Sequence, residues 1–364
     1  MIKHLNPEVQ EIIEAVHYWP SISLIMPLTA KINAEKELEQ SFNFKVDEVG
    51  RELKSNYSEE MSNLMIKKLQ LALKKVDLNL HKKAVAVYVS PVFEKIVYLD
   101  TAVQERIVID ESFEIRDLIY SKKRCSKYLL LLLSSKQFNI YLVNGDQFTK
   151  IETTIPENIA PYINEWPEKV ANFTDSIDKN QIIVQKFLQH IDKELNRILN
   201  DHELPVFVMG VKKILGHFKK ISKHQDFIAD YITGNYDKLS FAKLAEILES
   251  HLAVLWHKKD KEIVQILDNA EGENKLITGI KPVWEAVMDN LGNKVFVESD
   301  FVFSAQRAAK PNMIEELTEN YNEFSYIRDA VDDIIEKVIL NGGDVDFVDS
   351  GTLNNYEHIA LVTY

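Results

Sequence analysis

The residues best suited to chemistry in this sequence are a cluster of basic side chains between positions 212 and 224. Lysines grouped in this way can neutralise the phosphates of a nucleic acid. The whole chain carries a formal net charge of −13 at pH 7, so any phosphate-binding surface must be a local patch. We therefore predict a local phosphate-binding patch. The partner we expect for it, RNA and not DNA, follows from the resemblance described below. The members of the patch are Lys212, Lys213, His217, Lys219, Lys220 and Lys223, with His224 beside them.

Two pairs of residues have spacings that a metal ion could use. His217 and His224 are seven positions apart, and Asp344 and Asp346 would project from one face of a strand. Solvated side chains explain both pairs more simply, so we predict no metal site. The sequence also lacks the glycine-rich phosphate loops G-x-x-x-x-G-K-[ST] and G-x-G-x-x-G. We therefore predict no cofactor.

The composition is that of a soluble globular protein. Hydrophobic residues make up 46% and charged residues 27% of the 364 positions, a length that allows two or three domains. The longest apolar run, Leu129–Leu133, is far shorter than the ~20 residues of a membrane span. The acidic start of the chain does not resemble a signal peptide, and the single Cys125 excludes an intramolecular disulfide. These features predict a cytoplasmic protein without a membrane partner.

The basic cluster must be positioned by the elements around it. Tyr128–Leu133 is an unbroken apolar run, which predicts a strand buried on both faces. Gln137–Val143 predicts a second strand, and Asn144-Gly145 supplies a tight hairpin turn into a third strand that begins near Phe148. Downstream we predict a helix, a buried strand and a basic helix, at Ser176–Asn200, Val206–Val211 and Lys212–Ile221. Upstream, the polar stretch Ser121–Lys127 is predicted to be a linker.

The two ends of the chain also mix helices with strands. For the N-terminal part we predict helices at Pro7–Ala15, Ala34–Lys75 (with a break near Ser55–Ser58) and Asp117–Tyr120, and strands at Ser21–Pro27, Ala84–Val89, Lys95–Tyr98 and Glu105–Ile109. For the C-terminal part we predict helices at Ser240–Lys258, Ile280–Leu291 and Tyr326–Leu340, and strands at Lys294–Glu298, Val345–Val348 and Ile359–Tyr364. The predicted fold class is therefore mixed α/β. We predict three domains, at residues 1–122, 123–245 and 246–364.

The order of these blocks resembles the archaeo-eukaryotic class I release factors and their bacterial relatives of the "family 3" type. The resemblance rests on SISLIMPL (Ser21–Leu28) and KKAVAVYVS (Lys82–Ser90) in the first domain, and on the meander that starts at Tyr128 in the second. In the third domain it rests on Val283–Asp300, Gly342–Ser350 and the closing IALVTY. The resemblance implies three α/β domains in release-factor order. It also implies that the last domain is a sandwich similar to that of Pelota and of kink-turn-binding ribosomal proteins.

The sequence departs from the family at its functional motifs. Release factors carry a Gly-Gly-Gln loop between the hairpin and the long helix of the middle domain, but the corresponding connector, Thr153–Asp175, contains neither glycine nor glutamine. Gly145-Asp146-Gln147 lies one element too early and is interpreted as turn chemistry. The codon-reading Asn-Ile-Lys-Ser loop has only a partial match, at Asn43–Val46. The resemblance therefore does not extend to standard peptidyl-tRNA hydrolysis or stop-codon reading.

Three functional hypotheses remain open. The first is a release-factor-like protein that associates with the ribosome or tRNA in translation stress or rescue. The second is a divergent esterase-type hydrolase that uses Glu157, Asn158 and Asn164 of the connector. The third is a non-catalytic adaptor that keeps the fold and binds a protein partner.

Overall fold

The structure is a computed structural model. It describes residues 7–15, 19–28, 34–77, 80, 82–124, 127–145, 147–164, 176–236, 239–308, 310, 312–317 and 326–363, without the side chains of residues 34–39, 164 and 176–180. The chain divides into two compact units. Unit 1 comprises Met1–Cys125 and His257–Tyr364, and unit 2 comprises Ser126–Trp256. The three-domain division stays a prediction.

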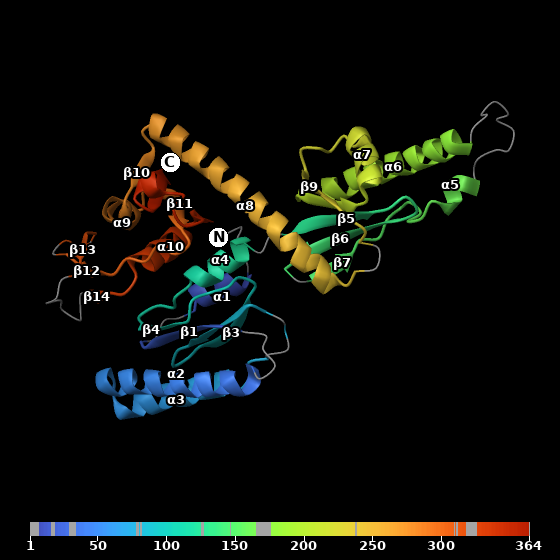
Figure 1. Ribbon diagram of the computed structural model, residues 1–364. Helices are drawn as coiled ribbons and strands as arrows, with labels where there is room; N and C mark the ends of the chain where they lie inside the picture. The colour runs from blue at the N-terminus through green and yellow to red at the C-terminus, as the bar shows by residue number, and fades with distance from the viewer. Residues whose placement is uncertain are drawn as a thin grey trace. The chain divides into compact units, whose positions relative to one another are not determined.

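Unit 2 is a five-stranded sheet with helices on both faces (Figure 1). The strand order is β7-β6-β5-β8-β9, in which β5, β8 and β9 are parallel and the hairpin strands β6 and β7 are antiparallel. Its strands are β5 (Tyr128–Leu133), β6 (Phe138–Asn144), β7 (Gln147–Lys150), β8 (Val206–Gly210) and β9 (Ile228–Thr233). Its helices are α5 (Ala160–Asn164), α6 (Ser176–Asp201), α7 (Lys212–Ile221) and the start of α8 (Phe241–Gly272).

Each face of this sheet has its own apolar core because the strands are buried on both sides. The core under α6 and α7 includes Leu129, Leu131, Phe187 and Phe218. The opposite core contains Leu130, Phe207 and Met209 of the sheet, and Leu244 and Leu248 from the first turns of α8. The alternation of side chains along β5 thus fills both cores, as expected for a continuous apolar run.

The N-terminal half of unit 1 is an antiparallel four-stranded sheet in the order β3-β2-β1-β4. Its elements are α1 (Pro7–Ile13), β1 (Ser21–Pro27), α2 (Ala34–Asn56), α3 (Glu59–Leu73), β2 (Ala84–Val89), β3 (Glu94–Leu99), β4 (Arg106–Asp110) and α4 (Arg116–Arg124). The helices α2 and α3 cover one face of the sheet. The break between them is confirmed, because the Ser58 hydroxyl caps α3 by accepting a hydrogen bond from the Met61 amide at 3.3 Å.

The C-terminal half of unit 1 has a four-stranded sheet, β10-β16-β11-β15, and a small one, β13-β12-β14. After the end of α8 its elements are β10 (Leu276–Thr278), α9 (Ile280–Met288), β11 (Gly292–Glu298), β12 (Ala305–Arg307), β13 (Ile314–Glu316), β14 (Tyr326–Ile327), α10 (Ala330–Leu340), β15 (Asp344–Val348), a 3₁₀ turn (Asn354–Tyr356) and β16 (Ile359–Thr363). One continuous apolar core contains residues of both halves, among them Tyr88, Leu118, Val283 and Ile335.

The mixed α/β prediction is confirmed, and several local predictions are corrected. The hairpin loop begins at Gly145 (φ 58°), while Asn144 is still paired in β6 with Gln147. The stretch Ser121–Lys127, predicted to be a linker, begins inside helix α4, which runs to Arg124. The helix predicted from Tyr326 begins only at Ala330, where Asp329 accepts a hydrogen bond from the Val331 amide and caps it.

A further correction concerns a helix end. Helix α8 runs to Gly272 rather than ending at Lys258. Cys125, Asp146 and the later part of the connector, residues 165–175, lie outside the described residues.

Candidate nucleic-acid interface

Helix α7 holds most of the predicted RNA-binding residues, and three apolar side chains fix its orientation. Ile214, Leu215 and Phe218 are buried in the core of unit 2. Residues spaced one, three and four positions apart, as these are, lie on one side of a helix. The helix connects the parallel strands β8 and β9 as the crossover of a β-α-β unit. The side opposite the apolar residues therefore points away from the sheet.

The exposed side of α7 is basic along its whole length. Apart from Gly216, each exposed position of the helix carries a basic side chain. These residues are Lys212, Lys213, His217, Lys219 and Lys220. The helix contains no acidic residue, so no carboxylate within α7 neutralises these charges.

Two of these lysines lie where they oppose the stability of the helix. Lys212 and Lys213 occupy the first turn, next to the positive end of the helix dipole, and no described side chain caps this end, where Val211 is the N-cap residue. Cations there disfavour a helix by about 0.3–1 kcal/mol. Lys219 and Lys220 in the last turn have the favourable placement. The first-turn lysines therefore do not stabilise the helix.

The turn after α7 is held in place by Gln225 and Tyr231. The Gln225 side-chain amide donates to the Lys219 carbonyl at 2.9 Å and accepts a hydrogen bond from the Tyr231 hydroxyl at 3.1 Å. The Lys219 ammonium lies 5.5 Å from the centre of the Tyr231 ring, within cation–π range. Burial raises the pKa of Tyr231, so the hydroxyl stays protonated as the donor. The C-terminal end of the basic face is therefore ordered.

A buried carboxylate contacts both Lys223 and His224. Asp192 of α6 is 6% exposed, and its Oδ2 accepts a hydrogen bond from the Lys223 amide at 3.2 Å. The same oxygen lies 3.9 Å from Nε2 of His224. This arrangement leaves the Lys223 side chain exposed beside α7. The structure thus brings Lys212, Lys213, His217, Lys219, Lys220 and Lys223 together on one helix and the turn that follows it.

A small pocket lies at the carboxyl ends of the parallel strands, beside the start of α7. Its cavity volume is about 20 Å³, room for about one water molecule, and it is lined by residues that include Leu133, Gly210, Val211, Gly234 and Tyr236. Small-molecule sites usually enclose about 300–1,000 Å³. A Cβ atom on Gly210 would lie 2.2 Å from the carbonyl oxygen of Leu133, so the close approach of β5 and β8 requires glycine here.

The connector residues of the esterase hypothesis take part in local structure. Glu157 pairs with Lys150 at 2.7 Å, and its carbonyl accepts from the Phe138 amide. Asn158 Oδ1 accepts a hydrogen bond from the Ala160 amide at 3.1 Å at the start of α5. Asn164 is the last residue of α5, and its side chain is outside the described part. The described contacts of Glu157 and Asn158 therefore fix the path of the connector.

Sequence reasoning missed the group that anchors this connector. Glu194 of α6 is 4% exposed and accepts hydrogen bonds from both the amide and the hydroxyl of Thr154, at 3.0 and 2.5 Å. Although burial raises it, the hydrogen bonds from Arg197 and Thr154 lower the pKa of Glu194 overall. The sequence did contain a signal for this group, because Glu194 is a polar residue on the otherwise apolar side of α6.

The aspartate pair considered as metal ligands has other partners. Asp344 and Asp346 form ion pairs with Lys123 and Lys294, at 2.5–3.3 Å. Within the described residues, His, Cys, Asp and Glu side chains form no group of three or more that could hold a metal ion. Among the described helices, none combines the length and apolar character of a membrane span.

The fold and this face define a mixed α/β protein with a basic helix exposed on a doubly covered sheet. Residues 127–290 match the family model described as bacterial archaeo-eukaryotic release factor family 3, a segment that includes the basic face. Over this segment the chain is similar to that family. No match was found among proteins of curated function.

Three solved structures illustrate what this chain is similar to. A model of ribosome-bound archaeal Pelota and ABCE1 is 12% identical, with 77% of each chain covered and a TM-score of 0.42. Dom34 of S. cerevisiae is 13% identical, covering 77% of this chain and 74% of that chain, with a TM-score of 0.37. The archaeal translation termination factor aRF1 is 12% identical, covering 98% and 97%, with a TM-score of 0.25.

Proposed function

We propose that this protein is a cytoplasmic, release-factor-like translation factor that binds RNA of the ribosome or tRNA through the basic face of α7. The face comprises the exposed basic residues of α7 together with Lys223. The observation that carries the proposal is that each exposed position of α7 except Gly216 is basic, including the two first-turn positions where a cation disfavours the helix. The match of residues 127–290 to a release factor family supports translation RNA as the partner.

Such a face binds the RNA backbone rather than base edges. Lysine ammonium groups act as point charges for phosphate, and the binding free energy comes largely from the release of counterions. The apolar anchors Ile214, Leu215 and Phe218 hold α7 rigidly against the sheet, so the lysines are arranged before binding. We therefore expect binding that depends strongly on salt and weakly on RNA sequence.

The proposed role is binding without the hydrolysis of release factors. The chain contains no Gly-Gly-Gln sequence, and the connector at the corresponding place has no glycine. Glu157 and Asn158 are engaged in turn and pairing contacts. A role in translation stress or rescue, as a factor that occupies the ribosome or tRNA, fits these features better than cleavage of peptidyl-tRNA.

The test is co-sedimentation of the full chain with bacterial ribosomes across a salt series. The variant carries charge reversals at the four lysines of α7, K212E, K213E, K219E and K220E. Each phosphate contact contributes about 0.7–0.9 to the slope of log affinity against log salt, so the variant should lower that slope by about 3 and weaken binding strongly. The matched control reverses four exposed lysines of unit 1, at Lys67, Lys74, Lys258 and Lys261.

Three results would count against the proposal. Ribosome binding by the α7 variant with an unchanged salt slope would exclude this face as the contact. Absence of wild-type binding at low salt, to empty ribosomes and to ribosomes carrying peptidyl-tRNA, would favour the adaptor hypothesis. Hydrolysis of peptidyl-tRNA that is lost in E157Q would instead support the esterase hypothesis.

A further inference from the structure

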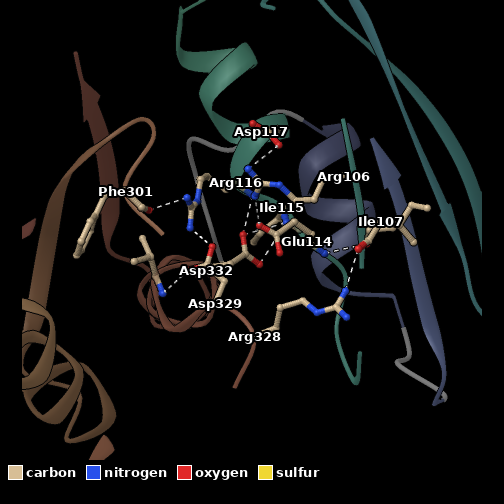
Figure 2. A network of polar contacts seen from close by, with 12 residues as sticks. Arg106, Ile107, Glu114, Ile115, Arg116, Asp117, Phe301, Arg328, Asp329 and Asp332 are labelled. Atoms are coloured by element: carbon tan, nitrogen blue, oxygen red, sulfur yellow. Dashed lines mark hydrogen bonds and ion pairs between the residues drawn. The ribbon is translucent and has the colours of Figure 1, made fainter. Parts of the chain in front are cut away.

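The two halves of unit 1 meet at a buried polar joint (Figure 2). The N-terminal half contributes residues 106–117, and the C-terminal half contributes residues 301–333. The most unusual contact is a helix cap supplied from the other half. Oδ1 of Asp332, at the start of α10, accepts hydrogen bonds from the Arg116 amide at 2.8 Å and the Ile115 amide at 3.1 Å. These amides lie at the start of α4, which Asp332 therefore caps.

Arg116 crosses the same joint in the opposite direction. Its side chain is fully buried, and its guanidinium forms an ion pair with Asp329 and donates to the Phe301 carbonyl at 2.6 Å. Asp329 is itself the cap residue of α10. Each half thus caps or pairs with the first turn of a helix in the other half, and Figure 2 shows these groups converging.

The joint contains more carboxyl groups than guanidinium groups. Glu114, Asp117, Asp329 and Asp332 are each at least 90% buried, and Asp333 lies beside them on α10. Among the described residues, the cations that pair with them are Arg116 and Arg106, of which Arg106 bonds to Glu114 at 2.9 Å. Arg106 lies 4.0 Å from Asp117, beyond hydrogen-bond distance. If each of the five carboxyls were ionised, these two cations and Arg307, which lies near Asp333, would still leave an uncompensated negative charge in a buried place.

Three buried polar atoms at the joint have no hydrogen-bond partner in the part of the chain that the structure describes. They are the Tyr88 hydroxyl oxygen, Nε of Arg116 and Oδ2 of Asp117. An ionised Asp117 with a bare oxygen would be costly in such a place, whereas a protonated carboxyl can donate a hydrogen bond. The surplus of carboxyls and the unpaired Oδ2 of Asp117 together indicate that the closed joint holds protons.

We propose that this joint is a proton-dependent latch, which closes the two halves of unit 1 on each other when its surplus carboxyls are protonated. Opening breaks the Asp332 cap and the Arg116–Asp329 pair and releases the protons to water. The shared apolar core, which includes Ile115 and Leu118 on one side and Val331 and Ile335 on the other, keeps the latch closed in most molecules. Release of the protons raises the fraction of molecules in which the latch is open.

The pKa values of carboxyls at the joint are raised, as a latch that closes on protonation requires. Burial, with Asp110, Glu336 and Glu114 nearby, raises the pKa of Asp333 to about 7, although Arg307 opposes this. Burial raises the pKa of Asp117 against the opposing effect of Arg106 and Arg116. Burial and Glu114 also raise the pKa of Asp332. These groups are on β4, β12, α4, α10 and the segment between β4 and α4.

The sign of the pH effect follows from the raised pKa values. A carboxyl whose pKa is raised in the closed state stabilises that state fully below its ordinary pKa of about 4, and the stabilisation is lost as the pH rises through the raised value. For Asp333 the window is therefore about pH 4 to 7. A single group with a pKa of about 7 lowers the closing constant about tenfold between pH 6 and pH 8.

The experiment is peptide-resolved hydrogen exchange of the full chain at pH 6 and pH 8, corrected for the intrinsic rates. Protection of the segment 113–119 reports the latch, because the Ile115 and Arg116 amides donate to Asp332. We expect this protection to fall about tenfold or more at pH 8 in the wild type. D333N and D117N, which resemble the protonated forms, should each reduce the pH difference, and D226N, at an exposed aspartate of unit 2, should keep it.

Further outcomes decide the proposal. D329N should weaken protection of 113–119 at both pH values, because it removes the partner of Arg116. Equal wild-type protection at pH 6 and pH 8, or an unchanged pH difference in the D333N, D117N double variant, would overturn the latch. Loss of protection in β2, in step with 113–119, would mean that the whole unit unfolds rather than opening at the joint. That result would also overturn the proposal, whereas failure of RNA binding by α7 would leave it untouched.

Discussion

At the scale of single residues, unit 2 depends on Gly210 at the end of β8. Strands β5 and β8 pair in parallel, with Leu133 opposite Gly210. Any side chain at position 210 would point at the Leu133 carbonyl oxygen, which is part of the backbone and cannot rotate away. The two strands can therefore approach closely at this end, where α7 begins, because position 210 has no side chain.

Gly210→Ala should destabilise the protein by about 1–3 kcal/mol, because the new methyl group would force β5 and β8 apart. Urea unfolding of the full chain, followed at a probe in unit 2, measures this loss. Unfolding curves that coincide with those of the wild type would show that the strands can separate here without cost.

Single residues also show where sequence reasoning stops. The lysines of α7 and the cap at Ser58 were predictable because each depends on neighbours within a few positions. The Asp332 cap of α4 joins residues more than 200 positions apart, so no local pattern contains it. Glu194 and Asp192 were missed for a related reason, because their partners come from other elements.

At the scale of elements, α7 shows a local sequence pattern that determines both bounds of a helix. The predicted range Lys212–Ile221 is the observed one, since three apolar residues and the surrounding basic residues set a clear helical period. Strand β9 was missed because only one of its six residues is fully buried and because it includes Asp230. Helix α8 was predicted too short because the charged stretch near Lys258–Glu262 resembles a helix end.

Gly216→Ala should stabilise α7 by about 0.5–1 kcal/mol, because alanine has the higher helix propensity. A Cβ atom at this exposed position would meet no described atom within 4 Å. Thermal unfolding of the full chain measures the gain, and the salt-dependent ribosome binding of this variant should match that of the wild type. A lower stability would mean that α7 needs the freedom of glycine at its centre.

At the scale of the whole molecule, unit 1 is built from two stretches of chain with unit 2 inserted between them in the sequence. The described residues of these two stretches share one apolar core and the polar joint. The mixed α/β class was predictable from alternating helices and strands. The pairing of the first and last parts of the chain was not, because the joint depends on bonds between residues more than 200 positions apart.

A chain cut between Arg124 and Lys127 should remain in one piece under native conditions, because the shared core joins the fragments without a covalent bond. Insertion of a specific protease site there, cleavage and gel filtration at pH 6 measure this. The N-terminal fragment should elute with the rest of the chain and separate only in denaturant. Two separate peaks at pH 6 would show that the core of unit 1 does not hold across the cut.

The joint also has a consequence during synthesis, because its two halves are made at different times. Helix α4 emerges about 200 residues before Asp332, the residue that caps it. At translation rates of about 5–20 residues per second, the N-terminal half would wait roughly 10–40 s with Arg116 and the apolar residues beside it uncovered. Unit 2 is completed during this interval. A nascent chain arrested before residue 301 would therefore expose an apolar surface on an otherwise finished sheet, and exposed apolar surface is what chaperones of new chains bind.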